Sequence, residues 1–102
     1  MTQTTSSPTI LFIAGHWLGA WAWDEVLEHL NAAGPRAVAM TLPGLDANDP
    51  ERATKTLDDQ AAGILGELAR LGVSEQHPAI IVAHSGANAP VSLVLDRHPE
   101  LF

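Results

Sequence analysis

The chain has 102 residues with 12 acidic and 5 basic side chains, a formal net charge of −7, and 46% of its residues are hydrophobic. This length allows one domain, and the composition is that of a globular protein, too apolar for a disordered chain. The acidic excess argues against a nucleic-acid partner, whose phosphates need clustered lysines and arginines, and the absence of cysteine excludes disulfides, thiolate metal sites and a cysteine nucleophile.

Residues 1–8 (MTQTTSSP) contain neither a basic segment nor a long apolar one, so we do not interpret them as a secretory signal. We expect a flexible leader here and a single domain over residues 9–102. No apolar stretch approaches the roughly 20 residues that a transmembrane helix needs. The expected location is therefore the cytoplasm, with no membrane partner.

The first strand is predicted over residues 9–14 (TILFIA), a short run that is apolar on both faces, as in a parallel strand between two helix layers. A helix is predicted from Trp23, because apolar residues then recur on one helical face. These residues are Trp23, Val26, Leu27 and Leu30. Gly34 followed by Pro35 predicts the end of this helix.

A second strand is predicted over residues 36–42 (RAVAMTL), followed by a polar loop over residues 45–55. The second helix is predicted over residues 56–71, because Thr56 and Asp59 have the spacing of a capping box. Its predicted buried stripe consists of Ala61, Ile64, Leu65, Leu68 and Leu71.

The third strand is predicted over residues 79–83 (AIIVA) and the third helix over residues 86–97. The inward residues of this helix are predicted to be Ala87, Val91, Val94 and Leu95. Strands that alternate with helices in this way indicate right-handed βαβ units. The predicted fold class is therefore α/β, a three-layer sandwich around a parallel sheet.

Residues 83–87 (AHSGA) lie where the third strand passes into the third helix, and they fit a relaxed form of the nucleophile elbow G-x-S-x-G. In such an elbow a tight turn lifts the serine hydroxyl, here that of Ser85, above the sheet. The N–H groups at the start of the helix, beginning with Gly86, would then face an oxyanion. A serine that merely caps an ordinary strand-to-helix turn is the competing interpretation.

Residues 14–23 (AGHWLGAWAW) follow the first strand and contain three tryptophans within seven residues. In one interpretation Trp23 begins the helix core and the other two tryptophans cover the end of the sheet. In the functional interpretation Trp17 and Trp21 form an apolar wall beside a substrate, and the N–H of His16 is a second oxyanion donor.

Together, these segments resemble the α/β-hydrolase superfamily. Residues 12–23 (FIAGHWLGAWAW) resemble the oxyanion loop of small esterases and of the related hydroxynitrile lyases, and residues 41–44 (TLPG) resemble the turn after the next strand. Residues 82–90 (VAHSGANAP) and 93–102 (LVLDRHPELF) resemble the elbow and the helix that follows it. The resemblance implies that residues 9–102 are the N-terminal portion of an α/β-hydrolase fold, belonging to a cofactor-free serine hydrolase of small, apolar carboxylic esters.

Carried over by position, the resemblance makes Ser85 the nucleophile. It places the main-chain N–H groups of His16 and Gly86 in the oxyanion hole, and Trp17 and Trp21 in the substrate pocket. The expected partner is thus a small-molecule ester.

The base that such a serine needs is not apparent in the chain. The triad of the family runs serine, acid, histidine in chain order, in members considerably longer than this chain. His98 follows Ser85, but at 1.5 Å per residue it lies about 20 Å along the helix, too far to take the hydroxyl proton. Of the upstream histidines, only His16 is near enough to be considered. We expect the triad acid and histidine to lie outside this chain. The sequence also departs from the family pattern at Ala14, where histidine is usual, and at both flanks of the elbow, where glycines are usual.

Two other hypotheses stay open. The same fold could carry a lyase that acts on cyanohydrins, or the chain could be a catalytically incomplete fragment or a module that forms a homo-oligomer through its open sheet edge. Asp46 and Asp49 could hold a cation, but they lack the spacing of a calcium loop, and neither nucleotide-binding glycine pattern is present. We predict no metal and no nucleotide cofactor.

Overall fold

The computed structural model describes residues 8–102, in which strand and helix alternate three times. The strands and helices are β1 (Ile10–Ile13), α1 (Asp24–Ala33), β2 (Ala37–Met40), α2 (Leu57–Arg70), β3 (Ile80–Ala83) and α3 (Asn88–Arg97). Short 3-10 turns, η1 (Ala20–Trp23), η2 (Arg52–Thr54), η3 (Ser85–Ala87) and η4 (Pro99–Leu101), join or end them. All but the last residue of the expected leader lies outside the described residues.

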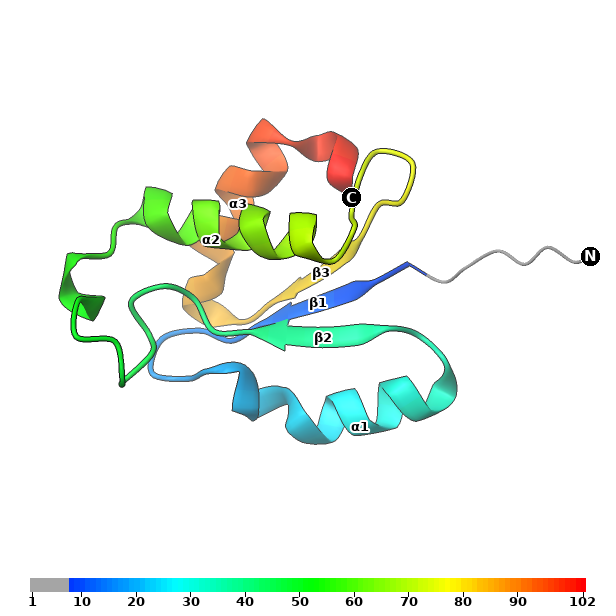
Figure 1. The fold of residues 1–102 in the computed structure, drawn as a ribbon, viewed down its shortest axis with the longest axis horizontal. Helices are drawn as coiled ribbons and strands as arrows, with labels where there is room; N and C mark the ends of the chain where they lie inside the picture. Colours follow the sequence, from blue (N-terminus) through cyan, green and yellow to red (C-terminus); the bar gives the residue numbers. More distant parts are fainter. Residues whose placement is uncertain (1–7) are drawn as a thin grey trace, which may run out of the picture.

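The three strands form one parallel sheet in the order β2-β1-β3. Leu11 of the central strand pairs with Val38 on one side and with Ile81 on the other. Figure 1 shows α1 on one side of this sheet and α2 with α3 on the other. The predicted three-layer α/β architecture is confirmed. Because the strands are parallel, the segments that follow their carboxyl ends meet at one edge of the sheet.

The main core lies between the sheet and the α2–α3 layer. Alternation along β1 turns Leu11 and Ile13 into this core and Phe12 toward α1, where its ring packs on Trp23 with centroids 4.8 Å apart. The helices contribute Ala61, Ile64, Leu68, Ala87, Val91 and Val94, all buried. This continuous core holds α3, and with it the turn between β3 and α3, against the sheet.

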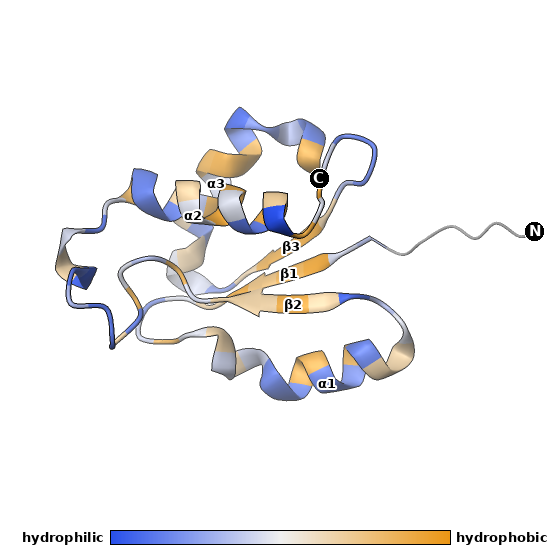
Figure 2. Cartoon of the chain, in the orientation of Figure 1, coloured by the Kyte–Doolittle hydropathy of each residue, from blue (hydrophilic) through white to orange (hydrophobic). Residues whose placement is uncertain are grey.

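The α1 side of the sheet is only partly covered. The apolar helical face predicted for α1 includes Val26, but α1 contains no buried residue and Val26 is 39% exposed. On the same side, Ile80 of β3 is 48% exposed. Ile80 is exposed because α1 packs over β2, whereas Ile80 lies on β3 at the opposite edge of the sheet. Figure 2 shows hydrophobic residues on α1 and along the strands.

Two further details differ from prediction. Leu95 was expected to point inward, but it is 39% exposed, because the face of α3 that packs on α2 is formed by Pro90, Val91 and Val94. The segment 45–55, predicted as a loop, contains the short η2 turn. None of the helices in residues 8–102 is long and apolar enough to cross a bilayer.

Helix α2 begins at the predicted capping box. The N–H of Asp59 donates to the Thr56 hydroxyl (3.1 Å), and the N–H of Thr56 donates to the Asp59 carboxylate (2.9 Å). The bond that the Thr56 N–H donates to the Asp59 carboxylate stabilises its charged form and is the main cause of the lowered pKa of Asp59.

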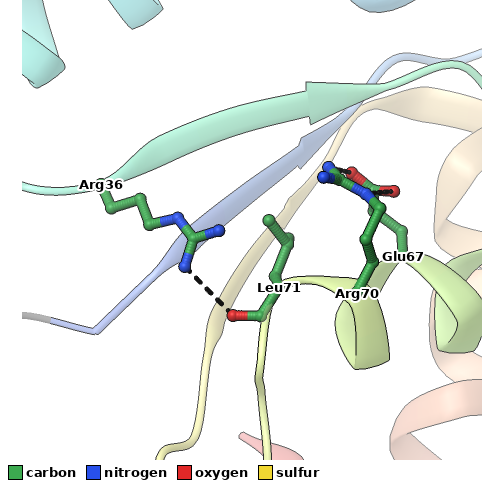
Figure 3. Close-up of polar contacts among 4 residues, drawn as sticks. All are labelled: Arg36, Glu67, Arg70 and Leu71. Atoms are coloured by element: carbon green, nitrogen blue, oxygen red, sulfur yellow. Dashed lines mark hydrogen bonds and ion pairs between the residues drawn. The ribbon is translucent and has the colours of Figure 1, made fainter.

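The other end of α2 is held by two arginines (Figure 3). Arg70 donates to the Glu67 carboxylate on the same helix, which lowers the pKa of Glu67. Arg36, which directly precedes β2, donates from Nη1 to the carbonyl oxygen of Leu71 at 3.1 Å. This bond ties the end of α2 to the start of the sheet and satisfies a carbonyl that the helix leaves unpaired.

Candidate active site

Ser85 lies on a tight turn immediately after β3. Its φ is +54°, in the left-handed region that a serine seldom occupies, and the residue is exposed. The parallel pairing continues to His84, whose N–H donates to the carbonyl oxygen of Ile13 (3.1 Å), and the chain then turns into η3. Asn88 secures the turn by donating from Nδ2 to the carbonyl oxygen of Ser85 (2.9 Å). A strained backbone that places a polar side chain in the open is typical of a functional position.

Gly15 brings the loop after β1 directly against this turn. A Cβ on Gly15 would lie 2.7 Å from the carbonyl oxygen of His84 and 2.9 Å from the Cβ of Ser85, so only glycine fits there. Gly15 was not among the site residues predicted from the sequence. Its position directly after a buried strand, at the carboxyl edge of the sheet, was the available signal.

The side chain of His16 lies over Gly86. A Cβ on Gly86 would overlap the His16 imidazole, so the absence of a side chain at Gly86 makes room for this ring. Within residues 8–102 no hydrogen bond joins His16 to Ser85, and the main-chain N–H groups of His16 and Gly86 donate to no protein acceptor. The structure thus brings Ser85, Gly86 and His16 together, without a base bonded to the serine.

The loop after β1 carries Trp17 and Trp21 into solvent. Trp17, with φ +71°, is 92% exposed and Trp21 is 64% exposed, whereas Trp23 is packed on Phe12. The two exposed tryptophans border a groove of about 420 Å³. Its lining residues are Trp17, Leu18, Gly19, Trp21, Thr41, Leu45, Asp46, Ala47 and Asn48. Ser85 is not among these lining residues, and the role of the loop at 45–48 in forming the groove was not foreseen from the sequence.

His84 points to the other face of the turn. It lines a separate hollow of about 200 Å³ with Ala14, Leu18, Ala22 and Trp23. This placement agrees with strand alternation, which turns the side chains before and at the serine in opposite directions. His98 lies at the far end of α3, where its Nδ1 is 3.5 Å from the Glu100 carboxylate. Across residues 8–102, no three histidine, aspartate or glutamate side chains gather as metal ligands would.

Residues 10–98 match the model of the alpha/beta hydrolase family. The chain belongs to this family. It is 30% identical over 91 residues to putative methylesterase 14, chloroplastic, of Arabidopsis thaliana, covering 88% of this chain and 26% of that protein. It is 36% identical over 92 residues to methylesterase 4 of the same plant, covering 86% of this chain and 34% of that protein. The chain therefore spans about a quarter to a third of these relatives.

Solved structures agree on the fold. An extracellular alpha/beta-hydrolase from a Paenibacillus species superposes with a TM-score of 0.78 at 19% identity, covering 93% of this chain and 37% of that one. Tomato methylketone synthase I superposes with a TM-score of 0.79 at 18% identity, covering 95% and 37% respectively. These superpositions confirm the fold, and the match of residues 10–98 to the family model confirms the family predicted from the sequence.

Proposed function

We propose that this chain carries the nucleophile and the oxyanion hole of a serine hydrolase that cleaves small carboxylic esters. The observation that carries the proposal is the backbone of Ser85, held at φ +54° on an exposed turn between a buried strand and a helix. An ordinary capping serine has an extended backbone, and its hydroxyl accepts a hydrogen bond from an N–H of the first helical turn. The backbone of Ser85 is not extended, and its hydroxyl makes no capping hydrogen bond. The esterases and methylesterases among the relatives support the same chemistry.

The first step is attack by the Ser85 hydroxyl oxygen on the ester carbonyl. A bond forms between this oxygen and the carbonyl carbon, and the hydroxyl proton passes to a base. The carbon–oxygen bond to the alcohol then breaks, and the alcohol leaves with that proton. Water afterwards attacks the acyl-serine in the same way, which releases the acid and restores Ser85.

The negative charge that develops on the carbonyl oxygen is met by the N–H groups of His16 and Gly86. Both lie next to the turn, and neither is engaged by a protein acceptor within the described residues. Donors that have no other partner are available to stabilise this charge in the transition state.

We propose that the base and its acid come from polypeptide outside residues 1–102. Two observations support this: no described histidine bonds to Ser85, and the chain spans only about a quarter to a third of its curated relatives. Trp17 and Trp21 would form the apolar wall for a small, uncharged ester. A cytoplasmic location and a homo-oligomer formed through the open sheet edge stay predictions.

The test uses the complete polypeptide that contains these residues. We expect hydrolysis of 4-nitrophenyl butyrate, and a loss of at least a thousandfold in kcat for Ser85→Ala. Ser92→Ala, an exposed serine on α3, is the matched control and should keep full activity. If the Ser85→Ala protein keeps full activity, the proposal is wrong. Cleavage of mandelonitrile without ester hydrolysis would instead identify a lyase.

A further inference from the structure

The loop that carries His16 and the tryptophans is attached to the sheet at two points. One is the close contact of Gly15 with the Ser85 turn beside β3. The other is a side chain on the opposite neighbouring strand: the Thr41 hydroxyl, directly after β2, accepts a hydrogen bond from the main-chain N–H of Ala20 at 2.8 Å. The loop thus spans the end of the sheet between β3 and β2.

The contact at Thr41 is tight as well as polar. A Cβ on Gly19 would lie 2.9 Å from the Thr41 hydroxyl and 3.1 Å from the indole of Trp21. The Thr41 side chain therefore fills the space beside Gly19 and borders the same groove as Trp17 and Trp21. Ala20 is partly buried. If the Thr41 hydroxyl were removed, water would replace it only in part as the acceptor for the Ala20 N–H.

The other hydrogen bonds of the loop are local, from the N–H of Leu18 to the carbonyl oxygen of Gly15 and from the N–H of Ala22 to that of Gly19. The His16 ring also lies over Gly86, and Trp17 is exposed. Among the hydrogen bonds of residues 8–102, the bond from Ala20 to Thr41 is the one that connects this stretch to a distant part of the chain, 21 residues away.

We propose that Thr41 is a positioning residue that holds the loop at residues 16–22, and with it the oxyanion donor at His16 and the wall at Trp21. This inference rests on the proposed hydrolase function. Thr41 touches no reacting atom. Its hydroxyl holds the loop on the β2 side, and Gly15 holds it on the β3 side. Together these contacts keep the His16 N–H beside Ser85.

The test compares Thr41→Val with Thr41→Ser in the complete polypeptide. Valine keeps the shape of threonine and removes the acceptor, whereas serine keeps the acceptor. The concentration of active sites is titrated with a fluorophosphonate, so that misfolded protein is not counted. We expect Thr41→Val to lower kcat per labelled site at least tenfold with a smaller change in KM, because an oxyanion donor acts in the transition state. Thr41→Ser should stay within threefold of the parent.

Amide hydrogen exchange at Ala20 gives a readout that does not depend on catalysis. We expect exchange to be at least tenfold faster in Thr41→Val and within twofold of the parent in Thr41→Ser. If kcat per labelled site and the exchange rate are both unchanged in Thr41→Val, Thr41 does not position the loop. If Ser85 takes no label even in the parent, the hydrolase function is wrong, and the exchange measurement alone decides whether Thr41 holds the loop.

Discussion

At the scale of single residues, the backbone conformation of Ser85 lowers stability and is explained by the proposed function. A left-handed backbone is unfavourable for serine and open to glycine, so the fold maintains this turn against a local preference. The proposed role explains why a serine stands at a position that glycine would occupy with less strain.

Replacement of Ser85 by glycine should therefore stabilise the protein while it abolishes activity. We expect Ser85→Gly to be more stable than Ser85→Ala by about 1 kcal/mol, measured by denaturant unfolding of the complete polypeptide. At Ser92, inside α3, the order should reverse, with the glycine variant about 1 kcal/mol less stable than the alanine variant. Equal stabilities of the two Ser85 variants would show that the turn is not strained.

Gly15 provides the second prediction at this scale. An added methyl group would overlap main-chain and side-chain atoms of the Ser85 turn, which belong to a strand end that has little freedom to move. Gly15→Ala should lower stability by about 1–3 kcal/mol and reduce the rate at which a fluorophosphonate labels Ser85. A variant with parental stability and labelling rate would show that the loop does not pack on the turn as described.

At the scale of elements, the two glycines of α2 differ in what surrounds them. A Cβ on Gly63 would lie 2.7 Å from the ring of Pro43, whereas a Cβ on Gly66 would meet nothing within 4 Å. Gly63 thus allows α2 to approach the turn after β2, which also carries Thr41, and Gly66 only weakens the helix.

The pair gives a matched experiment on one helix. Gly66→Ala should raise the free energy of unfolding by about 0.5–1 kcal/mol, from helix propensity alone. Gly63→Ala should lower it, because the clash with Pro43 exceeds that gain. Thermal unfolding of the two variants measures the difference, and stabilisation by Gly63→Ala would contradict the close packing.

The capping box of α2 predicts a pH dependence of stability. Hydrogen bonds from Thr56 lower the pKa of Asp59 in the folded state, so its contribution is present above the unfolded-state pKa, near 4, and is lost as the pH falls through the folded-state pKa. Asp59→Ala should therefore be less stable than the parent at pH 7, and the gap should close in strong acid. A gap of constant size from pH 7 to pH 2 would argue against a charged cap.

The same elements show what local pattern can and cannot predict. The capping box and the turn at Ser85 were predicted because neighbouring residues specify them. The error at Leu95 arises because periodicity tells which face of a helix is apolar, but not whether another element covers every residue on that face. The contacts of Gly15 with the elbow and of Thr41 with Ala20 join segments far apart in sequence, and no local pattern encodes them.

At the scale of the whole molecule, the two faces of the sheet differ in how completely helices cover them. The α2–α3 side is a packed core that sets the position of the Ser85 turn, and the α1 side leaves Ile80 open. The curated relatives are about three to four times as long as the matched segment, so their additional chain has room to cover such a face and to supply a base. What residues 8–102 would provide under the proposed function is the nucleophile, its turn and the two oxyanion donors.

The central claim is that Ser85 is the nucleophile, and covalent labelling tests it most directly. The complete polypeptide is treated with a fluorophosphonate, digested, and the modified residue is located by tandem mass spectrometry. We predict a single adduct on Ser85 that disappears in Ser85→Ala and persists in Ser92→Ala. An unmodified Ser85 in active protein, or an adduct that persists in Ser85→Ala, would contradict the claim.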